Sequence, residues 1–471
     1  MAVVLRPYQE AAIQGLRDAF AADYHSPLLV LPTGGGKTVC FSYLTSRLQQ
    51  ARKRVAILVH RDELVDQVSE TLARFDVPHG FVSAGRTPDY RPLALVCSVQ
   101  TLVRRMDRVP APDYVICDEA HHCIGASTWG AVIARWRDAN PALRLIGVTA
   151  TPERLSGEGL GEIFDEMVLG PSTRELIDLE ALAEYRLFAP AQQLDLSGVR
   201  SRMGDFAKAD VAAKVDKPAI IGSAVGEYRA KLNGAPAVAF CVSIEHAEHT
   251  AEQFRAQGFR AAKLDGNMDR AVRKELVRDF GRGEVQVLTS VDVISEGFDV
   301  PGIVGAILLR PTQSLGLYLQ QVGRALRTAP GKEAAIILDH VGNSQRHGLP
   351  DDPREWSLLG RGERKGKGAK DPDDVAIRQC PSCFAVSPAA ASKCRECGAA
   401  FPLKPRTIEE VAGSLSEVEV ARMKIDARRE QAMAATLEDL ERLAIKRGYA
   451  NPAGWAHMIM KHRKPAARRR A

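Results

Sequence analysis

Short apolar runs alternate with amphipathic stretches in the first 350 residues, and this alternation limits the fold more than any other feature. The runs LLVL, VAILV, LALVCSV, YVICD and LIGVTA are separated by stretches such as TVCFSYLTSRLQQ and DELVDQVSETLARF. This pattern predicts parallel strands joined by crossover helices. It resumes near residue 236, after a less regular stretch from about 154 to 225, with AVAFCVS, AAKLD, VQVLTS, GAILL and AAIILD. The sequence therefore predicts two α/β lobes joined by a connector.

A chain of 471 residues is longer than one hydrophobic core usually supports, so several domains are expected. The chain has no apolar run of membrane-spanning length and its amino terminus lacks the pattern of a signal peptide, so we expect a cytoplasmic protein without a membrane partner. Nine cysteines are too few for a disulfide scaffold of this length. Five of them are expected to be small core residues: Cys40, Cys97, Cys117, Cys123 and Cys241.

The net charge of +6 comes from the residues after 350, mostly from the terminal KHRKPAARRRA, because acidic and basic residues balance in the first 350. The net charge therefore does not predict a nucleic-acid groove in the two lobes. The basic end could neutralise phosphates without reading sequence, or it could be a solubilising tail.

The glycine-rich segment PTGGGKT follows the first apolar run directly. Between a strand and a helix, such a loop turns its amides toward phosphates, and the helix amino terminus adds its dipole. Lys37 would reach the β and γ phosphates of a nucleoside triphosphate, and Thr38 would ligate magnesium. The general phosphate-loop pattern needs a glycine where this chain has Leu31, but the variant P-T-G-x-G-K-T is matched in full. The predicted nucleotide-binding residues of this loop are Thr33, Gly34, Gly35, Gly36, Lys37 and Thr38.

Two adjacent carboxylates, Asp118 and Glu119, end the apolar run in YVICDEAHH. Ligands bind at the carboxyl ends of strands in open α/β sheets, so Asp118 is predicted to hold magnesium. Glu119 is then placed to orient and deprotonate the attacking water. An isolated Asp-Glu pair is usually a solvated loop, but the preceding apolar strand and the upstream phosphate loop favour a catalytic pair.

The segment QQVGRALR in the second lobe offers cations to the charge that develops during phosphoryl transfer. Arg324 and Arg327 are three residues apart on an expected helix, so they share one face. Two such arginines alone are usually a solvated surface, but Gln320 and Gly323 beside them favour a catalytic segment.

These motifs and their order resemble the superfamily-two DEAH-box helicases over about residues 5 to 345. The resemblance implies two tandem RecA-like parallel-sheet domains that use ATP and Mg²⁺. The segment LRPYQ resembles the family's nucleotide-sensing motif, which implies that Gln9 reads the adenine edge with Arg6 and Tyr8 nearby. Within VLTSVDVISEGFDVPG, the resemblance implies that Gly297 and Asp299 line the interlobe cleft.

The segment GVTATP resembles the motif that couples the nucleotide site to the bound strand, so Thr149 and Thr151 are implied to carry this coupling with His121. The loops LVHRDELVDQ, CSVQTL and FCVSIEHAE resemble the family's strand-contacting loops. The implied strand contacts are Arg61, Thr101, Ser243 and Thr289.

LRPYQ, the doubled histidine, and ILDHVGNSQRHG before a cysteine module look most similar to the RadD group of bacterial repair helicases, which is distantly similar to XPB. The resemblance implies an ATP-dependent DNA helicase or translocase of repair or recombination, with single-stranded or branched DNA and repair proteins as partners. RNA as the substrate, an ATP-gated recruitment factor without strand separation, and a restriction motor subunit with its nuclease elsewhere stay open.

Two Cys-x2-Cys pairs with ten residues between them occur in QCPSCFAVSPAAASKCRECGAAF. Four thiolates in this spacing close a tetrahedron around zinc, so a structural zinc ribbon is expected rather than a disulfide pair. The predicted ligands are Cys380, Cys383, Cys394 and Cys397. Phe384 and Phe401 are expected to pack over so small a fold.

The chain after residue 350 is predicted to begin with a flexible linker rich in Gly, Pro and charge and to end in a charged helical region with a basic tail. The expected division is 1–172 for the first RecA-like domain, 173–350 for the second, 351–379 for the linker, 380–402 for the zinc module and 403–471 for the helical region.

Overall fold

We describe a computed structural model of the chain, which defines residues 4–154, 157–190, 194–202, 204–291, 294, 302–360, 377–401, 434, 436–447 and 452–461. These residues form two units, one up to Phe401 and one after it. Among the described residues, no helix combines the length and the apolar character needed to cross a membrane.

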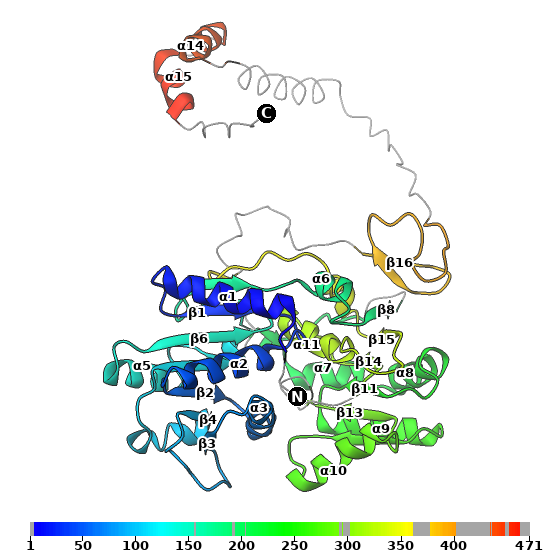
Figure 1. Ribbon diagram of the computed structural model, residues 1–471. Helices are drawn as coiled ribbons and strands as arrows, with labels where there is room; N and C mark the ends of the chain where they lie inside the picture. The colour runs from blue at the N-terminus through cyan, green and yellow to red at the C-terminus, as the bar shows by residue number, and fades with distance from the viewer. Residues whose placement is uncertain are drawn as a thin grey trace, which may run out of the picture. The chain divides into compact units, whose positions relative to one another are not determined.

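The first lobe is a seven-stranded parallel sheet with the order β3-β4-β2-β5-β6-β1-β7 (Figure 1). Its central strands are the predicted apolar runs, and they are almost completely buried because helices cover both faces of the sheet. The strands are β1 (Pro27–Val30), β2 (Val55–Val59), β3 (His79–Val82), β4 (Ala94–Ser98), β5 (Tyr114–Asp118), β6 (Arg144–Thr149) and β7 (Glu166–Leu169).

Alternation along β1 divides the core of this lobe in two, because successive side chains point to opposite faces. Leu29 packs with residues of α1, α2 and α3, whereas Leu28 and Val30 pack with α4 and α5. The helical elements are α1 (Pro7–Ala21), α2 (Lys37–Gln50), α3 (Asp62–Arg74), α4 (Val99–Leu102), η1 (Met106–Arg108), η2 (Ala120–His122) and α5 (Thr128–Ala139).

The second lobe is a six-stranded parallel sheet with the order β12-β13-β11-β14-β15-β8. In β11, Ala237 and Ala239 pack under α8 and α9, and Val238 and Phe240 pack on the opposite face with α7, α10 and α11. The strands are β8 (Glu184–Phe188), β11 (Ala237–Phe240), β12 (Ala261–Leu264), β13 (Val287–Ser290), β14 (Gly305–Leu308) and β15 (Ala334–Asp339). The helices are α6 (Thr173–Asp178), α7 (Lys208–Val215), α8 (Pro218–Lys231), α9 (Ile244–Ala256), α10 (Arg270–Gly281), α11 (Leu315–Ala325) and α12 (Asn343–His347).

The prediction of two parallel-sheet lobes is confirmed, and all ten predicted strands are present. The chain passes from the first sheet to the second between β7 and β8. Outside the predicted strands lie β3, β7 and β8 and a small antiparallel hairpin, β9 (Ser201–Arg202) with β10 (Asp205–Phe206). The segments HGFV, EMVL and EYRLF mix polar and apolar residues, so they lack the continuous apolar run that marks a central strand.

The first ten residues of the expected linker, 351–360, pack on the body and do not form a free tether. Asp351 accepts a hydrogen bond from the hydroxyl of Tyr185 and forms an ion pair with Arg174 at 3.3 Å. Leu358 accepts a backbone hydrogen bond from Gly161 at 2.9 Å, and Trp356 packs against cores of both lobes. The polar composition was therefore misleading here, because a few apolar and charged side chains suffice to fix the segment.

The cysteine module contains the two-stranded sheet of β16 (Ile377–Gln379) and β17 (Val386–Pro388). In the unit after Phe401, the described helices are α14 (Leu437–Lys446) and α15 (Pro452–Lys461), which pack on each other. A capping box stabilises α14, in which Thr436 and Asp439 satisfy each other's backbone amides at 3.1 Å.

Candidate functional site

The phosphate loop connects β1 to α2, as predicted from its sequence. Gly34 and Gly36 have φ angles of 88° and 86°, a region that side chains with a Cβ rarely adopt. These two residues let the loop turn tightly before α2 begins at Lys37. The amino-terminal amides of α2 therefore face the loop, which is the arrangement that favours phosphate.

Asp118 and Glu119 lie at the carboxyl end of β5, and both are buried. The backbone N–H of Glu119 donates to the Asp118 carboxylate at 3.0 Å, and Glu119 itself has a positive φ of 51°. Burial and the neighbouring Glu119 raise the pKa of Asp118 to about 6, and the Lys37 ammonium acts in the opposite direction. Burial likewise lowers the pKa of Lys37, although Glu119 and Asp118 oppose this. Lys37, Asp118 and Glu119 therefore lie in one site. A magnesium ion bound there would offset the negative charge of the two neighbouring carboxylates.

Helix α11 of the second lobe lies directly on the phosphate loop of the first. A Cβ added to Gly323 would stand 2.6 Å from the Cβ of Thr33, and a Cβ on Gly34 would stand 3.5 Å from the Cγ of Arg327. The helix ends at Ala325, so Arg327 lies just beyond it and not on its face as expected. Arg324 and Arg327 nevertheless both line the cavity that contains Lys37.

The cavity between the lobes has a volume of about 580 Å³, within the range of small-molecule sites. Thr33, Gly34, Gly36, Lys37, Thr38, Asp118, Glu119, Arg324 and Arg327 contribute to its wall. Gly35 and Gln320 are not part of this wall, and Gln320 is buried in α11. Cationic side chains outnumber carboxylates around the cavity, which suits a polyphosphate accompanied by one divalent cation.

One wall of this cavity was missed by sequence reasoning. Helix α10 presents Arg270, Arg273, Lys274 and Arg278 to it, and Lys274 forms an ion pair with Asp66 of α3 at 2.9 Å. The available signal was the spacing of three and four residues between these cations in MDRAVRKELVRDF, which puts them on one helix face.

The predicted coupling residues are in contact with each other. His121 Nδ1 lies 3.4 Å from the Thr149 hydroxyl and 3.5 Å from the Glu119 carboxylate. The Thr149 hydroxyl in turn donates to the carbonyl of Thr151 at 2.8 Å. A Cβ added to Gly316, at the start of α11, would stand 2.9 Å from the Thr151 hydroxyl. A continuous series of contacts therefore joins Glu119 to the helix that carries Arg324.

The amino-terminal segment lies against the phosphate loop and not in the wall of the cavity. The Gln9 side-chain oxygen accepts a hydrogen bond from the Arg6 backbone N–H at 3.0 Å, and its amide nitrogen lies against Gly36. The Tyr8 hydroxyl donates to the carbonyl of Gly35 at 3.2 Å. In this arrangement Tyr8 and Gln9 support the loop, and the reading of adenine by Gln9 stays a prediction.

The predicted strand contacts are not all brought together. Arg61 and Ser243 line opposite sides of a second interlobe cavity of about 620 Å³, and the Ser243 hydroxyl also caps α9. Thr101 lies half-buried on α4, outside this cavity. Thr289 does not fit its predicted role, because it is fully buried and its hydroxyl donates to the carbonyl of Ala247 at 2.7 Å. Gly297 and Asp299 lie outside the described residues.

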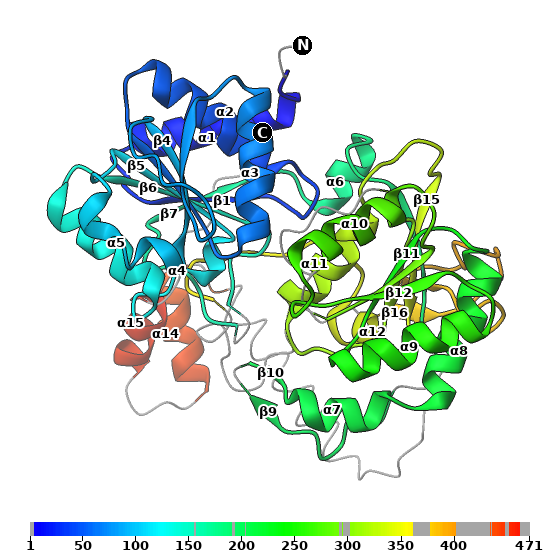
Figure 2. The ribbon, with the colours of Figure 1, turned by 90° about the horizontal axis from the view of Figure 1, so that it is seen from below.

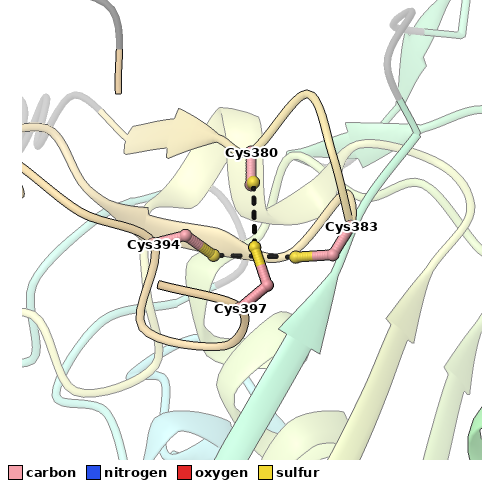
Figure 3. Close-up of side chains that lie close together, drawn as sticks. All are labelled: Cys380, Cys383, Cys394 and Cys397. Atoms are coloured by element: carbon pink, nitrogen blue, oxygen red, sulfur yellow. Dashed lines mark hydrogen bonds between the residues drawn. The ribbon is translucent and has the colours of Figure 1, made fainter. Parts of the chain in front are cut away.

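The four predicted zinc ligands come together in the cysteine module (Figure 3). Their sulfur atoms lie within 4.8 Å of one another, and the pairs Cys380–Cys397 and Cys383–Cys394 are both 3.6 Å apart. Zinc–sulfur bonds of about 2.3 Å in a tetrahedron place the sulfurs about 3.8 Å apart, so this geometry fits zinc with no position left open. The other five cysteines are buried, as predicted.

The cysteine module packs against β8, the edge strand of the second sheet. Arg186 on this strand forms an ion pair with Glu396, and Phe188 pairs with Ala385 in an isolated bridge. Phe401 is buried as expected, but Phe384 is 48% exposed. Phe384 therefore covers the module only in part, and its backbone has a positive φ of 60°.

The two lobes, with a phosphate loop on one and an arginine-bearing helix on the other, define a nucleoside triphosphatase of two α/β domains. Residues 2–154 match the family described as "Type III restriction enzyme, res subunit", and residues 217–329 match "Helicase conserved C-terminal domain". The chain belongs to the superfamily-two helicases and is an ATP-hydrolysing protein of the helicase type.

The chain is similar to proteins of phages and of yeast. A 51.5 kDa protein of a Lactococcus phage (isolate 7-9) is 34% identical over 397 residues, which cover 84% of this chain and 83% of the phage protein. The putative ATP-dependent helicase IRC3 of Saccharomyces cerevisiae is 30% identical over 73% of this chain, which spans only 52% of the yeast protein.

Among solved structures, a fragment of a putative HsdR subunit of a type I restriction enzyme from Vibrio vulnificus has a TM-score of 0.59 at 21% identity. The match covers 74% of this chain and 66% of that one. This likeness shows the shared fold of the two lobes.

Proposed function

We propose that this protein is an ATP-dependent DNA helicase or translocase that acts in DNA repair or recombination. The observation that carries the proposal is the cavity to which the first lobe contributes Lys37, Asp118 and Glu119 and the second contributes Arg324 and Arg327. Hydrolysis at a site shared by two lobes can drive their opening and closing, and alternating grip on a strand turns this motion into movement.

Each side chain has one part in the proposed chemistry. Lys37 and the amino terminus of α2 hold the phosphates, and Thr38 and Asp118 hold the magnesium ion, which neutralises charge on the phosphoryl oxygens. Glu119 deprotonates the attacking water, and Arg324 and Arg327 stabilise the charge that develops in the transition state. His121, Thr149 and Thr151 then transmit the state of Glu119 to α11.

The choice of DNA, and the assignment to repair or recombination, follow from resemblance to the RadD group and not from the charge of the lobes. A relative from Sulfurisphaera tokodaii is named "DNA 3'-5' translocase XPB2" and is 25% identical over 71% of this chain, which agrees with the distant XPB likeness. We also propose a cytoplasmic location, contacts with repair proteins through the region after residue 402, and the domain division given above.

A motor subunit of a restriction system is the second candidate function. A type I restriction enzyme subunit of Escherichia coli, that of EcoKI, is 25% identical over 72% of this chain, which spans 34% of the subunit. In this candidate another polypeptide supplies the nuclease.

Rates of ATP hydrolysis with single-stranded DNA, forked DNA, duplex DNA and RNA test the proposal. We expect single-stranded or forked DNA to stimulate hydrolysis most, and Glu119→Gln to lower the stimulated kcat by at least about 100-fold. The proposal would be wrong if no nucleic acid stimulates ATP hydrolysis and if Lys37→Ala hydrolyses ATP at the wild-type rate.

The same measurements separate the alternatives. Stronger stimulation by RNA than by any DNA would favour an RNA helicase, and stimulation without unwinding of a forked substrate would favour an ATP-gated recruitment factor. ATP-driven displacement of a third strand from duplex DNA, without strand separation, would show translocation, which both the repair motor and the restriction motor predict.

A further inference from the structure

The hairpin of β9 and β10 lies in the segment between the two series of motifs, and no predicted site includes it. Asp205 pairs with Arg202, and Phe206 pairs with Ser201, in an antiparallel register. Helix α7 follows at once, beginning at Lys208 (Figure 2). Arg202 and Lys208 are both exposed.

A buried carboxylate fixes this hairpin to the second lobe. Asp205 accepts hydrogen bonds from the Thr312 hydroxyl at 3.0 Å and from the Gln313 backbone N–H at 2.8 Å, and it lies 3.4 Å from the Arg310 guanidinium. The Ser201 hydroxyl adds a bond to the Gln313 side chain at 3.0 Å. Such a satisfied buried network holds its parts rigidly, so the hairpin moves as one body with the loop that follows β14.

The hairpin and α7 form one side of an interlobe cavity of about 970 Å³, and the loop after the catalytic carboxylates forms the other. His121, His122 and Arg154 face it from the first lobe. From the second lobe, Arg202 and Lys208 line it. Around this cavity too, cationic side chains outnumber carboxylates.

Lys208 also lines the cavity that contains Arg61 and Ser243. The two cavities therefore adjoin at the first turn of α7. A strand held between Arg61 and Ser243 would continue past Lys208 and Arg202 toward His121. Cationic side chains on a rigid support along such a path are how proteins grip single strands without reading their bases.

We propose that the β9–β10 hairpin and the first turn of α7 form a binding site for the phosphate backbone of single-stranded nucleic acid. This site extends the strand path beyond the helicase motifs, and the proposal rests on the function proposed above. Because the hairpin belongs to the second lobe and faces the His121 loop of the first, each closure of the cleft moves its phosphate contacts relative to the first lobe.

The double variant Arg202→Ala/Lys208→Ala tests this site in the full-length protein. Binding of a fluorescent single-stranded DNA oligonucleotide is followed by anisotropy over a series of salt concentrations. We expect the Kd at low salt to rise about tenfold or more. The slope of log K against log[salt] should become shallower by about 1.4, or about 0.7 for each lost phosphate contact. Hydrolysis of ATP without nucleic acid should equal that of the wild type.

Arg17→Glu is the matched control, because it changes the net charge by the same amount as the double variant but lies on the exposed face of α1. It should keep the wild-type Kd and slope. Each single variant, Arg202→Ala or Lys208→Ala, should give about half the change in slope.

The outcomes separate this proposal from the proposed function. If the double variant keeps the wild-type Kd and slope while DNA still stimulates hydrolysis, the hairpin site is wrong and the motor function stands. If the wild type itself binds no single strand and is not stimulated, both proposals fail.

Discussion

Gly323 of α11 lies against Thr33 of the phosphate loop so closely that no side chain fits between them. A Cβ at position 323 would stand 2.6 Å from the Thr33 Cβ, well inside ordinary van der Waals contact. Thr33 belongs to the first lobe and Gly323 to the second, so this contact limits how closely Arg324 and Arg327 can approach Lys37.

Gly323→Ala should therefore separate the lobes slightly and weaken catalysis. A displacement of about 1 Å at a reacting centre can reduce a rate by about 100-fold, so we expect the stimulated kcat to fall by about 10- to 100-fold. Binding of ATP should change little, because the phosphate loop is intact. Steady-state kinetics and equilibrium nucleotide binding measure the two effects separately.

Gly222→Ala supplies the control for this variant. Gly222 lies on the exposed side of α8 in the same lobe, with no atom within 4 Å of an added Cβ. It should leave kcat unchanged and stabilise the protein by up to about 1 kcal/mol, since Ala favours helix over Gly. Equal kcat for Gly323→Ala and wild type would mean that this contact is absent from the catalytic state.

Lys332 binds backbone carbonyls at the end of the segment that contains Arg324 and Arg327. Its ammonium donates to the carbonyl oxygens of Arg327 at 2.7 Å and Ile303 at 2.8 Å, and also to that of Ala325. A cation on the last carbonyls of a helix satisfies acceptors that the helix leaves open and opposes its dipole. We therefore expect Lys332 to position Arg324 and Arg327, so that Lys332→Met should lower kcat by about tenfold with little change in KM.

The pH dependence of this effect has a distinct sign. Burial lowers the pKa of Lys332 to about 8, so the folded protein loses this proton as pH rises through about 8 while the unfolded chain keeps it. Deprotonation removes the charge and one donor from the carbonyls, so kcat should fall across this range.

The unfolded state binds more protons between the folded and unfolded pKa values, so the Lys332 contribution to the free energy of unfolding rises there. Falling kcat without falling stability would identify positioning. A flat wild-type profile between pH 7 and 9, or the same alkaline fall in Lys332→Met, would contradict the assignment. Urea unfolding at each pH provides the stability.

The sequence predicted the parts of the site that depend on local motifs. The phosphate loop, the carboxylate pair and the cysteine ligands lie where short-range geometry alone puts them, because each motif brings its own strand or turn. Contacts between the two lobes were harder to predict from the sequence. The cations of α10 and of the first turn of α7 line their cavities because segments far apart in the sequence pack together. The spacing of residues within one segment does not predict which distant segment it will face.

Thr289 and Tyr8 show that a motif also does not predict the orientation of a side chain. A motif places Thr289 in β13 and Tyr8 in α1 near the phosphate loop, but the motif does not say which way a hydroxyl points. In the fold, Thr289 bonds to the carbonyl of Ala247 and Tyr8 to that of Gly35. Burial decided these orientations, and burial depends on neighbours that the motif does not contain.

A zinc ion bound by the four cysteines of the module should stabilise the second lobe. The four thiolates fix the loops that cover β8, where Arg186 and Glu396 pair across the contact. An edge strand without a cover presents open backbone groups. Cys394→Ser should therefore reduce bound zinc from about one ion per chain to nearly none, and it should lower the melting temperature of the protein.

Two further variants separate the effect of losing the zinc ion from the effect of losing the ion pair between Arg186 and Glu396. Ser382→Ala changes an exposed residue of the first cysteine turn and should keep both zinc and stability. Glu396→Gln should keep the zinc but lose part of the stability, because it weakens the ion pair with Arg186 without touching a ligand. Metal analysis and thermal unfolding of all three proteins decide the matter. If Cys394→Ser loses its zinc and melts like the wild type, the module contributes nothing to the stability of the second lobe.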